Sequence, residues 1–280
     1  MHTIVNLNCA MRQKLKAQGM GLPETIKNRC SFALLERGIP VGYAYYEKEL
    51  SWAKNAIQIY IYISETHRRR GLGTELYRFI MNELKDEREK IVSVEIIERG
   101  SINPAYEFCK NVNAVDWQTL DRMSYSGKPF AETVKPVPYR DEYYVALAER
   151  KFEAWKPLAA DYGFDMSPYS ESERKEWLED ADNAFVYLTA DGVPVAMCSC
   201  GTEGHMHGLF VSRECKGQGI GRGLLMYCTN RVLERGFSKA TLSVLSRNTA
   251  KRMYYDMGFR VYEIEHYFKF QKESLNRNER

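Results

Sequence analysis

The fold is decided by HMHGLFVSRECKGQGIGRGLLMYCTNRVL, residues 205–233. This stretch opens with an apolar run over 205–211, passes through a basic connection into a glycine-rich turn, and ends in apolar residues at spacings of three and four. The first pattern predicts a strand and the last predicts a helix. A glycine turn that opens a helix favours anion binding, because the first N–H groups of a helix lack partners. We therefore expect a phosphate-bearing ligand at this turn.

A second copy of the pattern lies in the first half of the chain. IQIYIYISETHRRRGLGTELYRFIMNEL, residues 57–84, has the same strand, basic connection, glycine turn and helix. Matching positions stand 148 residues apart: Ile63 and Val211, Arg68 and Lys216, Gly73 and Gly221. Each helix is followed by an apolar strand (91–97, 240–246) and by an asparagine expected to open another helix, Asn103 or Asn248. Repetition of the whole unit indicates duplicated domains.

The boundary between the copies is predicted in SGKPFAETVKPVP (126–138), whose three prolines, glycine and small polar residues are typical of a linker. We expect an N-terminal domain over residues 1–126 and a C-terminal domain over 131–280. Each copy also predicts a hairpin ahead of its glycine turn, CSFALLERGIPVGYAYYE (30–47) and AFVYLTADGVPVAMCSC (184–200).

Two helices are predicted before the second hairpin. One spans 141–161, and the other follows the capping signal SESE at 170–173.

Composition narrows the class of protein. The chain has 280 residues, 44% of them hydrophobic, which suits two ordinary domains. A net charge of +3 lacks the positive excess of a nucleic-acid binder. Seven cysteines without a CxxC pair predict reduced thiols, no zinc site and a cytoplasmic location. With no 18-residue apolar run, we expect a soluble protein without a membrane segment. We also expect a monomer or a homodimer.

The spacing of the glycines excludes two common phosphate motifs. A dinucleotide turn GxGxxG would need glycine where Arg222 or Leu224 stands, and neither copy has the Gly-Lys-Ser/Thr of a P-loop. The pattern [Gln/Arg]-x-x-Gly-x-[Gly/Ala] fits instead. It matches Arg68-Arg69-Arg70-Gly71-Leu72-Gly73 fully and, with Lys at its first position, Lys216-Gly217-Gln218-Gly219-Ile220-Gly221. The alternative for the three arginines is a solvated charge run.

With these motifs the chain resembles the GNAT superfamily (Gcn5-related N-acetyltransferases) over nearly its whole length, as two tandem copies. The second copy also carries the later family signature Asn248-x-Ala250-x-x-Met253-Tyr254-x-x-x-Gly258-Phe259. The resemblance implies an α/β (α+β) fold in which each domain has a mixed, mostly antiparallel sheet flanked by helices, with a splayed strand pair that binds acyl-CoA. Tandem members of this length are similar to antibiotic self-resistance acetyltransferases and to mycothiol synthase.

The resemblance also implies where acetyl-CoA lies. Its pyrophosphate would rest on the second turn and its pantetheine on the preceding strand, with the acetyl carbonyl near the N–H of Leu209 and Asn248 on the cofactor arm. The cofactor-binding candidates of this copy are Leu209, Phe210, Val211, Lys216, Gly217, Gln218, Gly219, Ile220, Gly221, Arg222 and Asn248. Those of the first copy, for a second, structural acetyl-CoA, are Ile61, Ile63, Arg68, Arg69, Arg70, Gly71, Leu72, Gly73 and Thr74.

Direct attack of an amine on the acetyl group needs a base for the amine and an acid for the thiolate. The family places the acid at Tyr254, whose alternative reading is a core aromatic. His205 and His207 lie two residues apart, so both project from one face of the strand. Because an ordinary histidine has a pKa of about 6.5, either one suits a base near neutrality. The pair looks like that of the arylalkylamine N-acetyltransferase branch. The alternatives are strand histidines with a structural role, a metal pair, or Glu203 as the base.

The N-terminal copy lacks these groups. Ile57 and Ile59 stand where the histidines would be, and Cys109 stands in the place of the tyrosine. This copy is therefore predicted to be catalytically degenerate. It either holds a structural acyl-CoA or only fills out the acceptor cleft.

The acceptor pocket is predicted to be built by residues 151–177 together with the cleft between the domains. Residues 151–177 combine aromatic and acidic side chains. That mixture suits a small molecule with a cationic primary amine, although the aromatics also suit a helix core. The function predicted is acetyl-CoA-dependent N-acetyl transfer in the C-terminal domain. The alternatives are a protein or peptide N-acetyltransferase and a non-catalytic acyl-CoA sensor.

Overall fold

The computed structural model describes residues 2–21, 30–48, 56–87, 91–98, 105–162 and 166–271. Its contacts divide the chain into two compact units. Unit 1 comprises Met1–Trp117 together with His266–Arg280, and unit 2 comprises Gln118–Glu265. The boundary predicted between 126 and 131 divides the sequence repeat and stays a prediction. By their contacts, residues 118–126 at the end of the first copy belong to unit 2, and residues 266–280 at the end of the second copy belong to unit 1.

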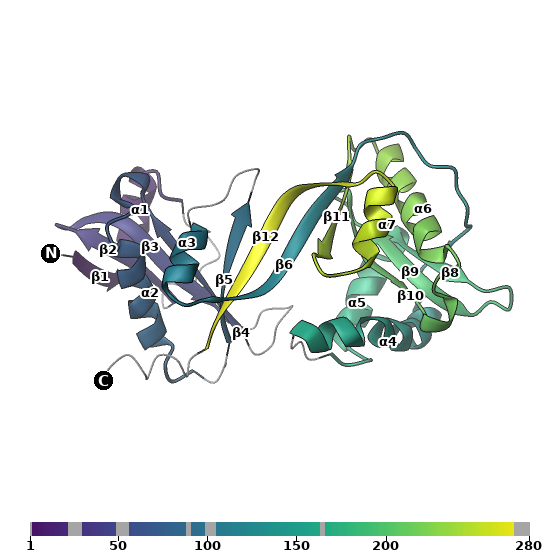
Figure 1. The fold of residues 1–280 in the computed structure, drawn as a ribbon, viewed down its shortest axis with the longest axis horizontal. Coiled ribbons are helices and arrows are strands. Elements are labelled where there is room, and N and C mark those ends of the chain that lie inside the picture. Colours follow the sequence, from purple (N-terminus) through teal and green to yellow (C-terminus); the bar gives the residue numbers. More distant parts are fainter. Residues whose placement is uncertain are drawn as a thin grey trace. The chain divides into compact units, whose positions relative to one another are not determined.

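Unit 1 is built on one sheet covered by helices. Its strands are β1 (His2–Asn6), β2 (Ser31–Glu36), β3 (Ile39–Glu47), β4 (Ala56–Ile63) and β5 (Ile91–Glu98), in that order across the sheet (Figure 1). The first four pair antiparallel, and β4 pairs parallel with β5. The helices are α1 (Cys9–Ala17), α2 (Leu72–Glu83) and α3 (Ala105–Asn111).

The last strand of the chain completes this unit. The second part of β12 (Arg260–Gln271) follows β5 in the strand order, and its Phe268 and Phe270 are 2% and 3% exposed. Both rings lie in the main core of unit 1, beside residues of β4 and α2.

Unit 2 repeats this architecture. Its sheet runs in the order β6 (Val115–Tyr125), β11 (Ala240–Leu245), β10 (His205–Val211), β9 (Pro194–Cys200), β8 (Ala184–Leu188) and β7 (Val137–Pro138). Only β10 and β11 pair parallel among these neighbours. The helices are α4 (Tyr144–Tyr162), α5 (Glu171–Glu179), α6 (Ile220–Glu234) and α7 (Ala250–Asp256) (Figure 1).

The sheet of unit 2 has a different core on each face. One core gathers α6 and α7 against Cys198, Met206 and Leu242, and the other gathers α4 and the tryptophans Trp155 and Trp177 against Met197 and Phe210. Met206 points to the face covered by α6 and α7. Because side chains alternate along a strand, its neighbours His205 and His207 point to the opposite face. The catalytic candidates are thus positioned by a sheet that is covered on both sides.

The local signals of the sequence produce the expected elements. Ser170 caps α5, its side chain accepting a hydrogen bond from the N–H of Glu173. Gly192 has φ +77° in the turn of the predicted hairpin. The predicted linker lies against α6 at Gly223, where a Cβ would stand 2.6 Å from Val134. Asn103 lies outside the described residues.

Candidate active site

The two glycine turns have the same backbone conformation. Gly217 and Gly219 have φ of 79° and 81°, and the equivalent Arg69 and Gly71 have φ of 63° and 79°. Arg69 adopts the left-handed region although it has a Cβ, so the turn of unit 1 keeps this conformation without the first glycine. Helices α6 and α2 begin directly after the turns, without a side-chain cap. Their first N–H groups are therefore suited to an anion, which fits the pyrophosphate of acetyl-CoA.

The side chains around the two turns differ. In unit 1, Arg70 donates from Nη1 to Glu36 over 3.2 Å, and Arg68 donates from Nε to the carbonyl of Ile63 over 3.0 Å. The hydrogen bonds from Arg70 and then from His2 lower the pKa of Glu36 to about 2. An ionised carboxylate therefore lies at this turn and offsets its positive charge. In unit 2 Lys216, Gln218 and Arg222 are exposed.

Strand β10 contains a bulge just ahead of its turn. His207 pairs with Ser199 and Phe210 pairs with Met197, so two residues of β10, Gly208 and Leu209, oppose one residue of β9. Gly208 has φ +66°, a value that favours glycine. On the other side, β10 pairs in parallel with β11 only at His205 and Met206. Leu209, near which the acetyl group is expected, therefore has no register partner in β9 or in β11.

The equivalent strand pair of unit 1, β3 and β4, has no such bulge. Strands β3 and β4 pair without interruption from Gly42↔Ile63 to Glu47↔Gln58. Tyr60 and Ile61, equivalent to Gly208 and Leu209, each have their own partner. The ring of Tyr60 stacks on that of Tyr45 with centroids 4.3 Å apart. One extra residue in β3 therefore closes the ladder that is interrupted in unit 2.

The two histidines share one face of β10 but have different surroundings. Nδ1 of His205 lies 3.1 Å from Oγ1 of Thr241. Burial, followed by the nearby charges of His207 and Arg122, lowers the pKa of His205, so this ring is neutral at physiological pH. His207 is more exposed, and its Nε2 lies 3.7 Å from Oδ2 of Asp180 at the end of α5. Sequence reasoning missed Asp180, because a helix C-cap carries no motif that links it to a strand 25 residues later.

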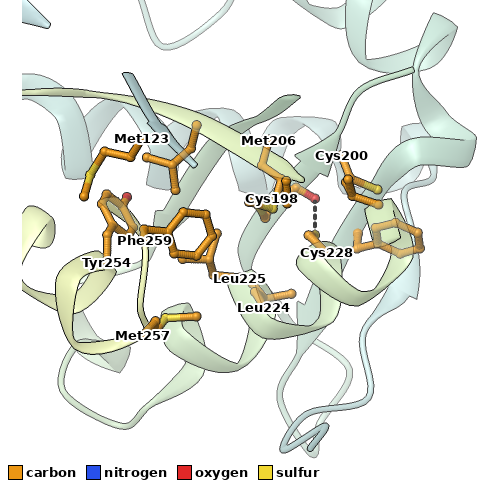
Figure 2. Packing of buried hydrophobic residues seen from close by; sticks show 14 of the residues in the cluster. Met123, Cys198, Cys200, Met206, Leu224, Leu225, Cys228, Tyr254, Met257 and Phe259 are labelled. Atoms are coloured by element: carbon orange, nitrogen blue, oxygen red, sulfur yellow. Dashed lines mark hydrogen bonds between the residues drawn. The ribbon is translucent and has the colours of Figure 1, made fainter. Parts of the chain in front are cut away.

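Tyr254 lies on the other face of the sheet. It is 7% exposed and packs edge-on to Phe259, with ring centroids 6.3 Å apart (Figure 2). Burial raises the pKa of its hydroxyl, and a smaller contribution comes from Cys198. Such a phenol keeps its proton at physiological pH, as an acid must. Its place in the core also agrees with the alternative of a packing aromatic.

Asn248 lies two residues before the first residue of α7, the helix that carries Tyr254. Its Oδ1 accepts a hydrogen bond from the N–H of Ala250 over 2.9 Å. The side-chain oxygen is therefore engaged within the chain, and contact with a cofactor arm would use its amide nitrogen. In unit 1, Cys109 is fully buried in the equivalent helix, and burial raises the pKa of its thiol to about 12.

Residues 151–177, where the acceptor site is expected, also contribute to the core of unit 2. Trp177 packs edge-on to Tyr139 and Tyr144, and Trp155 belongs to the same core. Glu173 pairs with Lys151, while Glu153 and Glu171 are exposed. Phe164 and Asp165 lie outside the described residues. The packing of both tryptophans agrees with the alternative of a helix core, and the acceptor site stays a prediction.

The His, Cys, Asp and Glu side chains of the described residues form no group of three or more that could hold a metal ion. In the part of the chain that the structure describes, no helix is long and apolar enough to span a bilayer.

Two family models match the chain, one in each half. The acetyltransferase (GNAT) family model matches residues 7–103, and the acetyltransferase (GNAT) domain model matches residues 161–271. Together they cover well over half of the chain, and they define the protein by class as an N-acetyltransferase that uses an acyl-CoA donor. The chain belongs to the GNAT superfamily as a tandem member, which confirms the resemblance and the fold class inferred from its sequence.

Solved structures share this fold over nearly the whole chain. A GCN5-related N-acetyltransferase from Sphaerobacter thermophilus has a TM-score of 0.70 at 18% identity, covering 97% of this chain and 96% of its own. A tandem GNAT protein from the clavulanic acid biosynthesis pathway has a TM-score of 0.61 at 15% identity, covering 97% and 99%. A GNAT-family acetyltransferase from Colwellia psychrerythraea has 0.61 at 14%, covering 96% and 100%. At these identities the likeness concerns the fold alone, and no curated protein matches the chain.

Proposed function

We propose that the C-terminal copy transfers the acetyl group of acetyl-CoA to a primary amine of a small cationic molecule. The observation that carries this proposal is the bulge of β10 at Gly208 and Leu209, beside His205 and His207. The N-terminal copy keeps the glycine turn but has neither the bulge nor the histidines. Its role is then structural, and the free thiols of unit 2 agree with a reducing, cytoplasmic setting.

The chemistry follows from the places of these groups. An amine on the face of β10 that carries the histidines loses a proton to one of them and attacks the acetyl carbon. The N–H of Leu209 is the proposed donor to the developing oxyanion. As the C–N bond forms and the C–S bond breaks, the departing thiolate takes a proton from Tyr254. This transfer takes place where β10 and β11 are no longer paired.

Thiol release from acetyl-CoA tests this function directly. We expect turnover with at least one member of a panel of polyamines, aminoglycosides and other amine-bearing antibiotics, and none with peptides. The double variant His205→Ala/His207→Ala should lower kcat by about 100-fold, the usual contribution of a general base. Turnover of peptides alone would favour the protein or peptide enzyme. Tight acetyl-CoA binding without turnover of any amine would favour the sensor.

A matched pair of glycine variants tests which copy is catalytic. Gly219→Val places a β-branched residue at φ +81°, and we expect its kcat/KM for acetyl-CoA to fall by at least about 10-fold. Gly71→Val makes the same change at φ +79° in unit 1 and should leave kcat/KM unchanged. Thermal unfolding of both variants controls for strain. A loss of activity in Gly71→Val alone would assign catalysis to the N-terminal copy.

Calorimetric titration addresses the second acetyl-CoA. If unit 1 also holds the ligand, the wild type binds two equivalents and the Arg68→Ala/Gly73→Val variant binds one. A wild-type stoichiometry of one would remove the second site from the proposal.

A further inference from the structure

One edge of the His207 imidazole faces Asp180 and Gly201. Its Nε2 lies 3.7 Å from Oδ2 of Asp180. The same edge lies over Gly201, where a Cβ would stand 3.6 Å from Nε2 and 3.7 Å from Cδ2. The side chain is otherwise open to solvent, with 53% of its surface exposed. Because Nε2 and Cδ2 form the edge nearest to Gly201, Nδ1 lies on the side of the ring away from Gly201.

Asp180 is itself fixed by a series of hydrogen bonds. Its Oδ1 accepts from Nδ2 of Asn183 over 2.8 Å, and Oδ1 of Asn183 accepts from Nη2 of Arg235 over 2.6 Å. Arg235 also donates from Nη1 to the carbonyl of Cys200 over 2.9 Å. The remaining oxygen, Oδ2, is buried and has no hydrogen-bond partner among the described residues. The series therefore leaves one carboxylate oxygen of Asp180 for His207.

His205 has no comparable partner in its described contacts. Its Nδ1 lies beside the hydroxyl of Thr241, and the charged neighbours that affect it are His207 and Arg122, which both disfavour a proton on the ring. In the described contacts of the two histidines, only His207 has a carboxylate in place to stabilise the imidazolium that forms when a base takes a proton.

We propose that Asp180 is a positioning residue, which holds His207 by Nε2 so that Nδ1 accepts the proton of the attacking amine. The proposal rests on the function proposed above. A neutral imidazole carries hydrogen on one nitrogen, and a carboxylate beside Nε2 favours hydrogen there, which leaves the lone pair of Nδ1 free. The distance of 3.7 Å exceeds a hydrogen bond and is expected to shorten when the imidazolium forms.

The ring tautomer of His207 tests this directly in the free protein. Its ¹⁵N resonances, assigned with the variant His207→Gln, should show the Nε2–H tautomer in the wild type. In Asp180→Asn the Nδ1–H tautomer should gain population, because an amide no longer selects hydrogen on Nε2. Asp182→Asn alters an exposed carboxylate two residues later and should match the wild type. An identical tautomer in wild type and Asp180→Asn would overturn the proposal.

Kinetics provide a second readout. We expect Asp180→Asn to lower kcat about 10- to 100-fold with an unchanged KM for acetyl-CoA, and Asp180→Glu to recover part of the loss. Suppose that the double variant His205→Ala/His207→Ala loses activity while Asp180→Asn keeps the full kcat. This result would overturn the role of Asp180 and leave the proposed function standing. A wild type inert toward every amine would refute the function instead, and the tautomer would still decide the contact. Should Asp180→Asn fail to fold, Asp180→Glu, which keeps the charge, should retain the wild-type tautomer. A changed tautomer in it would overturn the proposal.

Discussion

Tyr254→Phe is expected to lower kcat about 100-fold while acetyl-CoA binding stays unchanged. The ring is buried in the core of unit 2 against Phe259, so removing the hydroxyl leaves this packing intact. What the variant loses is the acid that protonates the thiolate, and positioned acids typically contribute about 10²- to 10⁴-fold. Steady-state kinetics with the accepted amine give kcat, and calorimetry with acetyl-CoA gives the dissociation constant.

Tyr255→Phe is the matched control. Tyr255 follows in the same helix but is 38% exposed, and its ring contacts the ammonium of Lys251 at 5.7 Å. Loss of its hydroxyl should leave kcat within about twofold of the wild type. Equal activity of Tyr254→Phe and the wild type would reduce Tyr254 to a packing residue and remove the acid from the proposed chemistry.

The pH dependence follows from the same burial. Because burial raises the pKa of Tyr254 above its ordinary value near 10, the phenol stays protonated at every pH up to that value. We therefore expect no loss of kcat from Tyr254 ionisation between pH 7 and about pH 10. A fall in kcat below pH 9 that disappears in Tyr254→Phe would contradict this assignment.

Local features of the fold were predictable because their causes lie close together in the sequence. The glycine turns, the cap at Ser170 and the hairpin at Gly192 each depend on a few neighbouring residues. The bulge of β10 was not predicted, although Gly208 is a signal for one. The bulge arises because β9 has one residue fewer than β3 between the residues that pair with equivalent positions of β10 and β4. Comparing the sequences of β4 and β10 alone does not reveal that difference.

Contacts between distant segments escaped sequence reasoning for a related reason. Asp180, the C-cap of α5, lies near His207 of β10, and no spacing rule connects the two residues. The end strands of the two copies, β6 and β12, both show strand patterns, but such a pattern does not identify the neighbouring strand. The sequence therefore predicted two copies without showing that each unit takes its last strand from the other half.

Phe268→Ala in the full chain is expected to destabilise unit 1 by about 3–5 kcal/mol, although residue 268 lies near the end of the second copy. Phe268 is 2% exposed and packs edge-on to Tyr106 of α3, with centroids 5.1 Å apart. Its core also contains residues of β4 and α2. Truncation leaves a cavity there, in addition to the lost burial, so the unit should open more often.

Hydrogen exchange measured by mass spectrometry locates this effect. In Phe268→Ala, exchange should accelerate in α2 and β4, whereas α6 and β9 keep wild-type protection. Phe259→Ala, which empties a fully buried site in unit 2, should give the opposite pattern. Tyr262→Ala changes a ring of β12 that is 40% exposed and should affect both regions little. If Phe268→Ala instead loosened α6 and spared α2, the C-terminal strand would belong to the copy that encodes it, and the exchange of end strands would be refuted.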